Sequence, residues 1–250
     1  MASTSNKNVQ YFRPADPVDA GMIVIPGGRY QYIGEKDCEP VAQWLNRHHL
    51  HAWVLRYECG EASKPLGEKV INEAKEAWNA IRKDFPGKIG IWGWSAGGHL
   101  AAMIGTNTTL SVNFLVLSYA VITMETDYTH IPSRVNLLGK NPSHEQIDEM
   151  SAERRVTKET PPTFIFHTKQ DESVPVENSI KFAEALNRER VPFVLKVQEE
   201  GKHGMGLAEW TDDLAPWLEN IRTRRPVIVG DTSDDWVPGK QCLHQNHRFE

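Results

Sequence analysis

The chain has 250 residues, of which 40% are hydrophobic and 24% charged, and its net charge is −5. This length and composition suit one α/β domain of a soluble globular protein. The negative charge leaves no basic footprint for nucleic acid, and no apolar stretch reaches the roughly 20 residues that cross a membrane. The polar first residues lack the apolar core of a signal peptide, and the cysteines are widely spaced, which favours free thiols in a reducing compartment. We therefore expect a cytoplasmic protein.

Strand-like and helix-like segments alternate along most of the chain. Apolar runs predict strands at residues 9–12, 22–26, 51–57, 88–92, 112–118, 162–168 and 192–197. Apolar residues at helical spacing predict helices at residues 38–48, 66–81, 96–104, 180–186 and 207–221. This alternation is typical of an α/β fold with a mostly parallel central sheet and helices on both faces. Residues 9–12 are expected at the edge of the sheet.

Two segments depart from this alternation. Residues 119–161 are long, polar and weakly periodic, and a segment of this kind is more often functional than idle. Ser143 and Gln146 fit a capping box that predicts a short helix there. From its position we expect a short cap-like insertion over the active site of a single domain, residues 1–223. Residues 224–250 contain prolines and glycines without a sustained pattern and are expected to form a C-terminal tail, which either docks on the body or is disordered.

A serine in a strand-to-helix turn stands out. Ser95 lies in Gly93-Trp94-Ser95-Ala96-Gly97, between the strand predicted at 88–92 and the helix predicted at 96–104. Such a turn holds a serine on a strained bend with its hydroxyl exposed, and the following helix directs its N-terminus toward developing negative charge. A Gly-x-Ser-x-Gly pattern alone also fits a purely structural turn. Whether the serine is catalytic therefore depends on whether the chain supplies a base and an acid for it.

A histidine and a carboxylate follow later strands in the order that this type of turn requires. A serine nucleophile needs a base and a group that orients the base, in the chain order serine, acid, histidine. Asp171 comes directly after the strand at 162–168, and His203 follows the strand at 192–197 in a glycine-rich loop. Glu172 is an alternative acid because it is adjacent to Asp171. His167, at the end of a strand, is interpreted as a core or supporting residue rather than the base.

The remaining histidines do not indicate a metal. His48, His49 and His51 lie across a helix end and a strand start, where their side chains are not expected to converge. His99 falls in the first turn of the serine helix and is interpreted as structural, although it lies near enough to touch the site. No HExxH or CxxC pattern is present, so we expect no metal and no cofactor.

Attack by the serine would place negative charge on a substrate oxygen, and backbone N–H groups are needed to stabilise that charge. One is expected from the N–H of Ala96, the residue after the nucleophile, and a second from the loop after the first core strand. That loop contains Gly27 and Gly28, which allow its backbone to approach the substrate closely. A simple turn would also explain the two glycines.

Together these motifs resemble the α/β-hydrolase superfamily, in particular its acetylxylan-esterase-like group, often labelled lipase/esterase. The likeness spans roughly residues 20 to 222, and the segments that carry it are 26–30, 95–101, 121–123, 136–139, 161–179 and 201–207. The resemblance implies that Ser95 is the nucleophile, His203 the base and Asp171 the orienting acid. It also implies that the N–H groups of Gly28, Arg29 and Ala96 form the oxyanion hole.

One residue of the glycine loop departs from that group. Arg29 stands where a third glycine is expected, followed by Tyr30. The arginine keeps its N–H, but its backbone loses freedom and a guanidinium is brought toward the site. We therefore hypothesise that Arg29 and Tyr30 contact the substrate, and that Arg29 meets a carboxylate or another anion on it. An arginine turned to solvent is the alternative.

The function expected from these observations is a serine carboxylic-ester hydrolase that works through an acyl-enzyme. The short cap suggests a small acyl group, such as acetyl on a sugar or small metabolite. An amidase, thioesterase or acyltransferase would use the same residues, and a non-catalytic binding protein of this fold is the remaining alternative. The expected partner is a small-molecule ester, with no nucleic acid and no membrane, and a homodimer is left open.

Overall fold

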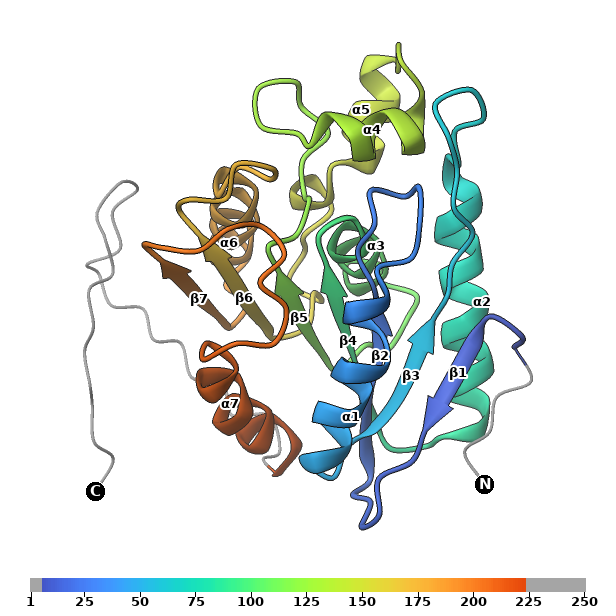
Figure 1. The fold of residues 1–250 in the computed structure, drawn as a ribbon, viewed down its shortest axis with the longest axis vertical. Helices are drawn as coiled ribbons and strands as arrows, with labels where there is room; N and C mark the ends of the chain where they lie inside the picture. The colour runs from blue at the N-terminus through green and yellow to red at the C-terminus, as the bar shows by residue number, and fades with distance from the viewer. Residues whose placement is uncertain (1–5, 224–250) are drawn as a thin grey trace.

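The structure is a computed structural model that describes residues 6–223 of the chain (Figure 1). These residues form a seven-stranded sheet with the strand order β1-β3-β2-β4-β5-β6-β7. The strands are β1 (Val9–Phe12), β2 (Ala20–Ile25), β3 (His51–Leu55), β4 (Lys88–Trp94), β5 (Phe114–Ser118), β6 (Thr163–Thr168) and β7 (Phe193–Gln198). Only the pairing of β1 with β3 is antiparallel among the described strands. The predicted mostly parallel sheet with 9–12 at its edge is therefore confirmed.

Helices cover both faces of the sheet. They are α1 (Glu39–Arg47), α2 (Glu68–Asp84), α3 (Ala96–Gly105), α6 (Glu177–Arg188) and α7 (Thr211–Thr223). Helices α1 and α7 pack with one face of β2 and β4 around Trp92, whereas α2, α3 and α6 pack on the opposite face around Ile91. Figure 1 shows α1 and α7 in front of the strands. The central strands are buried on both faces, which explains their nearly continuous apolar sequence.

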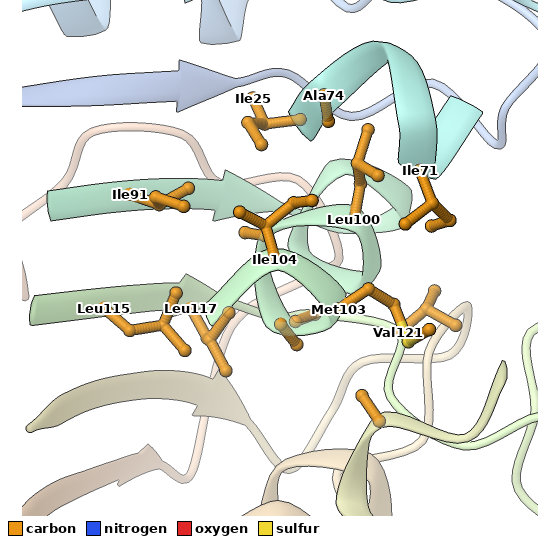
Figure 2. Close-up of a cluster of buried hydrophobic side chains, with 14 of the residues drawn as sticks. Ile25, Ile71, Ala74, Ile91, Leu100, Met103, Ile104, Leu115, Leu117 and Val121 are labelled. Carbon is orange, nitrogen blue, oxygen red and sulfur yellow. The ribbon is translucent and has the colours of Figure 1, made fainter. Parts of the chain in front are cut away.

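Helix α3 is surrounded by apolar side chains (Figure 2). Its residues Leu100 and Ile104 lie among side chains of β4, β5 and α2, and all of them belong to one buried cluster. Complete burial of the helix explains why its sequence is apolar on every side except at His99. The packing fixes the direction of α3, and hence the position of the turn that precedes it.

The segment between β5 and β6 lies beyond the carboxyl ends of the strands, as Figure 1 shows. It contains α4 (Ile131–Leu138), α5 (His144–Met150) and a short 3-10 turn, Ala152–Arg154. The capping box predicted at Ser143 is present. Helix α4 was not predicted, because its apolar stripe is short and Ile131 is half exposed.

The last helix begins later than its apolar spacing predicts. Helix α7 starts at Thr211, so Leu207 lies in the preceding loop. Gly204 and Gly206 have φ values of 78° and 67°, and this left-handed backbone keeps the loop from joining the helix. Within residues 6–223, no helix is long and apolar enough to cross a membrane. The predicted tail, residues 224–250, lies outside the described residues.

Candidate active site

Ser95 occupies a strained turn between β4 and α3. Its φ of 53° is in the left-handed region, which non-glycine residues rarely adopt. The flanking glycines are required by close packing: a Cβ on Gly97 would lie 2.2 Å from the carbonyl oxygen of Pro26, and one on Gly93 would lie 2.4 Å from that of Gly97. Ser95 is 6% exposed, so only a small part of the residue reaches solvent.

Three predicted residues form one hydrogen-bonded series. Ser95 Oγ lies 2.9 Å from His203 Nε2, and His203 Nδ1 lies 2.7 Å from Asp171 Oδ2. A carboxylate oxygen can only accept, so Nδ1 carries the proton of the neutral ring and Nε2 accepts from the serine hydroxyl. The tautomer that a general base requires is thereby set by Asp171.

The acid loop holds Asp171 in its ionised form. Its Oδ1 accepts the N–H groups of Ser173 and Val174, each at 2.9 Å. Burial opposes ionisation, but hydrogen bonds from His167, His203 and the Val174 N–H outweigh it and hold the pKa of Asp171 well below its usual range. Glu172, the alternative acid, is exposed to solvent. The carboxylate in contact with the histidine is therefore that of Asp171.

His167 supports this loop from beneath. It is fully buried, its Nε2 donates to the carbonyl of Val174 at 2.9 Å, and its Nδ1 accepts from the Ser179 hydroxyl at 2.7 Å. Its Nε2 also lies 3.3 Å from Asp171 Oδ2. The interpretation of His167 as a supporting residue agrees with these contacts.

The loop that carries His203 is held in place by contacts with residues that the sequence patterns did not single out. The ring of Tyr119 lies edge-on to the imidazole, with 4.9 Å between their centroids, and its hydroxyl accepts the N–H of Gly206 at 3.2 Å. On the other side, Lys36 Nζ donates to the carbonyl of Gly204 at 2.5 Å. Tyr119 directly follows β5, and this position at a strand end was the available signal.

Backbone donors lie next to the serine. A Cβ on Gly27 would lie 3.2 Å from the Cβ of Ser95, so the glycine loop contacts the nucleophile directly. Within residues 6–223, the N–H groups of Gly28, Arg29 and Ala96 have no hydrogen-bond acceptor. They are therefore available to a substrate oxygen, as the oxyanion-hole prediction requires.

The two side chains expected to touch substrate are placed very differently. Arg29 is exposed, and its carbonyl accepts from Asn136 Nδ2 of α4 at 3.0 Å. Tyr30 is completely buried, and its hydroxyl donates to His99 Nδ1 at 2.7 Å. A substrate contact through the Tyr30 side chain is thus contradicted, because a φ of 62° turns this residue into the core.

His99 joins three parts of the structure. Its Nδ1 accepts from Tyr30, and its Nε2 donates to the carbonyl of Met150 in α5 at 2.7 Å. Burial lowers the pKa of His99 to about 4, so the ring is neutral at neutral pH. The structural role interpreted for His99 agrees with these contacts.

A second histidine, in the segment between β5 and β6, was missed by the sequence patterns. His130 precedes α4, is buried, and places its Nδ1 2.8 Å from the hydroxyl of Ser133. Burial, followed in part by the nearby positive charge of Arg29, lowers its pKa to about 4. The ring is therefore a neutral polar group near Arg29 and His203.

The histidines near residue 50 have separate partners. His49 contacts the carbonyl of Asp16, His51 contacts the hydroxyl of Tyr11, and His48 packs on Trp44. No group of three or more His, Cys, Asp or Glu side chains within the described part of the chain is arranged to hold a metal ion.

Known proteins share both the sequence and the fold. The chain is 29% identical over 231 residues to an acetylxylan esterase from Xylanibacter ruminicola, an alignment covering 84% of this chain and 47% of that protein. It is 34% identical over 213 residues to endo-1,4-beta-xylanase B from Butyrivibrio fibrisolvens, covering 75% and 32%. The chain thus spans between about a third and a half of the length of these two curated relatives.

A solved structure is similar over most of its length. The acetyl ester-xyloside bifunctional hydrolase from Caldicellulosiruptor lactoaceticus is 34% identical, with a TM-score of 0.76, and the match covers 85% of this chain and 87% of that one. The model of the prolyl oligopeptidase family matches residues 63–223, which is more than half of the chain and includes Ser95, Asp171 and His203. The chain therefore belongs to the prolyl oligopeptidase family and has the α/β-hydrolase fold.

Proposed function

We propose that the chain is a serine hydrolase that cleaves short-chain carboxylic esters, with acetyl on a sugar or small metabolite as the preferred group. The hydrogen-bonded series Ser95–His203–Asp171 is the observation that carries this proposal. The names of two relatives, an acetylxylan esterase and an acetyl ester-xyloside bifunctional hydrolase, support the choice of acetyl.

In the first step, Ser95 Oγ attacks the acyl carbon while His203 Nε2 takes the hydroxyl proton. Asp171 accepts from Nδ1 throughout and stabilises the imidazolium that forms. The carbonyl oxygen becomes an oxyanion, to which the N–H groups of Gly28, Arg29 and Ala96 would donate; their lack of another acceptor in the described residues supports this role. Collapse of this intermediate breaks the bond to the alcohol, which leaves with the proton from Nε2.

In the second step, His203 takes a proton from water, and the resulting hydroxide attacks the acyl carbon of the acyl-enzyme. Collapse releases the carboxylic acid, and Ser95 regains its proton from Nε2.

Turnover of p-nitrophenyl acetate and of acetylated xylo-oligosaccharides tests this proposal. Wild-type protein should hydrolyse both, and Ser95→Ala should lose roughly 10⁴-fold or more in kcat. A fluorophosphonate probe should label wild type and not Ser95→Ala. Folded wild-type protein that neither labels nor hydrolyses any short acyl ester would contradict the proposal.

Cleavage of an amide is the second candidate, because the description of the matching family names a peptidase. The same residues would also serve a thioesterase or an acyltransferase. Rates on p-nitrophenyl acetate, p-nitroacetanilide and an acetyl thioester, each with and without an added alcohol acceptor, separate these reactions. We expect the ester to react fastest and the added alcohol to capture little of the acyl group.

The cellular setting is also a proposal. From the sequence we propose a cytoplasmic protein whose partner is a small-molecule ester, with no nucleic acid or membrane surface, and we leave a homodimer open. Cell fractionation and size-exclusion chromatography with light scattering would test location and oligomeric state.

A further inference from the structure

A buried carboxyl group that the mechanism does not use lies beside the glycine loop. Asp37 is 3% exposed and sits at the end of the short turn Glu35–Asp37 that precedes α1. Its Oδ2 accepts the N–H of Gly27 at 3.1 Å. Its Oδ1 is sealed from solvent and has no hydrogen-bond partner in the described part of the chain. Burying a carboxyl group with so few partners is costly, so its one hydrogen bond calls for an explanation.

The same turn also binds the carbonyl group of Gly27. The N–H of Gly34 donates to the carbonyl of Gly27 at 2.8 Å, and the N–H of Asp37 donates to the carbonyl of Gly34 at 2.9 Å. Both polar groups of Gly27 are therefore tied to residues 34–37. Because a trans peptide is planar, fixing the carbonyl of Gly27 also points the N–H of Gly28 in the opposite direction.

Gly27 packs so closely against the nucleophile that a side chain at this position would have little room. A Cβ at this position would lie 3.1 Å from the carbonyl oxygen of Trp94, 3.2 Å from Ser95 Cβ and 3.2 Å from Asp37 Oδ2. The backbone of Gly27 thus lies close to both the carboxylate of Asp37 and the serine turn. A rotation of this peptide would move the N–H of Gly28 relative to Ser95 Oγ.

Residues 34–37 also reach the loop of the base. Lys36 donates to the carbonyl of Gly204, the residue after His203. Burial raises the pKa of Asp37, whereas the Gly27 N–H and the positive charge of Lys36 lower it. One short turn connects the oxyanion donors with the loop of the base.

We infer that Asp37 is a positioning residue, whose side-chain oxygen holds Gly27 so that the N–H groups of Gly28 and Arg29 face the oxyanion formed at Ser95. This inference rests on the proposed function for its substrate. Asp37 acts through Gly27 and touches neither the substrate nor the reacting atoms.

The test compares Asp37→Leu, which keeps a similar shape without an acceptor, with Asp37→Asn, which retains one. Asp84→Ala, at the exposed far end of α2, is the matched control. Losing one oxyanion donor typically costs about 10²–10³-fold in rate. We expect Asp37→Leu to lower kcat for p-nitrophenyl acetate by about this factor with KM changed less than about threefold. Asp37→Asn should stay within about tenfold of wild type, and Asp84→Ala should match wild type.

Near-UV circular dichroism and urea unfolding establish that each variant is folded, and Asp37→Ala replaces the leucine variant if leucine does not fit. The inference is overturned if the variant without an acceptor keeps kcat within about twofold of wild type, if only KM changes, or if Asp37→Asn loses as much as Asp37→Leu. If neither apolar variant folds, Asp37→Asn decides alone: a folded Asp37→Asn that loses more than about tenfold in kcat overturns the inference.

The rate of Ser95 labelling by a fluorophosphonate separates this inference from the proposed function. Phosphonylation also places negative charge on an oxygen in the same hole. If wild type labels without hydrolysing acetate esters, the proposed function fails, and the labelling rates of the Asp37 variants still decide the inference. If wild type neither hydrolyses nor labels, both are overturned.

Discussion

The buried contact between Tyr30 and His99 allows a double-mutant test of how the glycine loop is held. Tyr30→Phe leaves His99 Nδ1 without its donor, at a cost of about 1–3 kcal/mol for one buried polar group. His99→Leu leaves two groups unpaired, the Tyr30 hydroxyl and the Met150 carbonyl, and should cost about 2–6 kcal/mol. The double variant leaves only the Met150 carbonyl unpaired and should cost no more than about 1–3 kcal/mol.

The two substitutions should therefore be strongly non-additive, with the double variant more stable than the sum of the single costs by about 2 kcal/mol or more. Urea unfolding at pH 8, followed through the fluorescence of the eight tryptophans, measures each free energy of unfolding. Equal m-values across the set are needed for a fair comparison. Costs that add within about 0.5 kcal/mol would refute the reasoning, because they would mean that the two side chains do not satisfy each other.

Other predictions concern pH and backbone strain. His99 is neutral in the fold with a pKa of about 4 against 6.5 for a free histidine, so the unfolded chain takes up the proton first. His99 alone should lower stability by about 3 kcal/mol between pH 6.5 and 4, so His99→Leu should lose about that much less than wild type, as urea unfolding across that window would show. Arg29→Gly relieves a left-handed backbone with φ of 60° and should raise the unfolding free energy by up to about 1 kcal/mol. It should also raise KM for acidic esters but not neutral ones, and an unchanged KM for both would contradict a charge contact by Arg29. Gly97→Ala drives its Cβ into the carbonyl oxygens of Ile25 and Pro26, so thermal unfolding should reveal a loss of about 3 kcal/mol or more.

The central parts of the site could be predicted because each is encoded locally. A fully buried strand, a Gly-x-Ser-x-Gly turn and an apolar helix are adjacent in sequence, so Ser95 could be found without the fold. Asp171 and His203 each follow a strand directly, and parallel strands bring their carboxyl ends to one edge of the sheet. The order of strands in space was not needed to assign these roles.

Residues whose roles depend on contacts with distant parts of the sequence could not be found in the same way. Asp37 and His130 carry no local motif, and Tyr119 shows only its position after a strand. Each becomes relevant only when the loops that hold them meet. Tyr30 was misjudged for a related reason. Its position next to Gly28 and Arg29 is plain in the sequence, but the side of the backbone on which its ring lies depends on a left-handed φ, which no pattern reveals.

Buried residues around Ser95 fix the positions of the catalytic groups, whereas exposed residues are available to select the substrate. His167, His99 and Asp37 are almost completely buried. Through hydrogen bonds to backbone or side-chain groups they hold the acid loop, the glycine loop and the segment between β5 and β6. Fixed donors and a fixed base of this kind serve any acyl transfer, because the oxyanion is common to esters, thioesters and amides. The choice among substrates must then come from groups that face outward, and Arg29, with its exposed guanidinium and its carbonyl tied to α4, is one of them. Substitutions at the buried positions should therefore lower kcat for every substrate alike, whereas substitutions at Arg29 should change the ratio of kcat/KM between substrates.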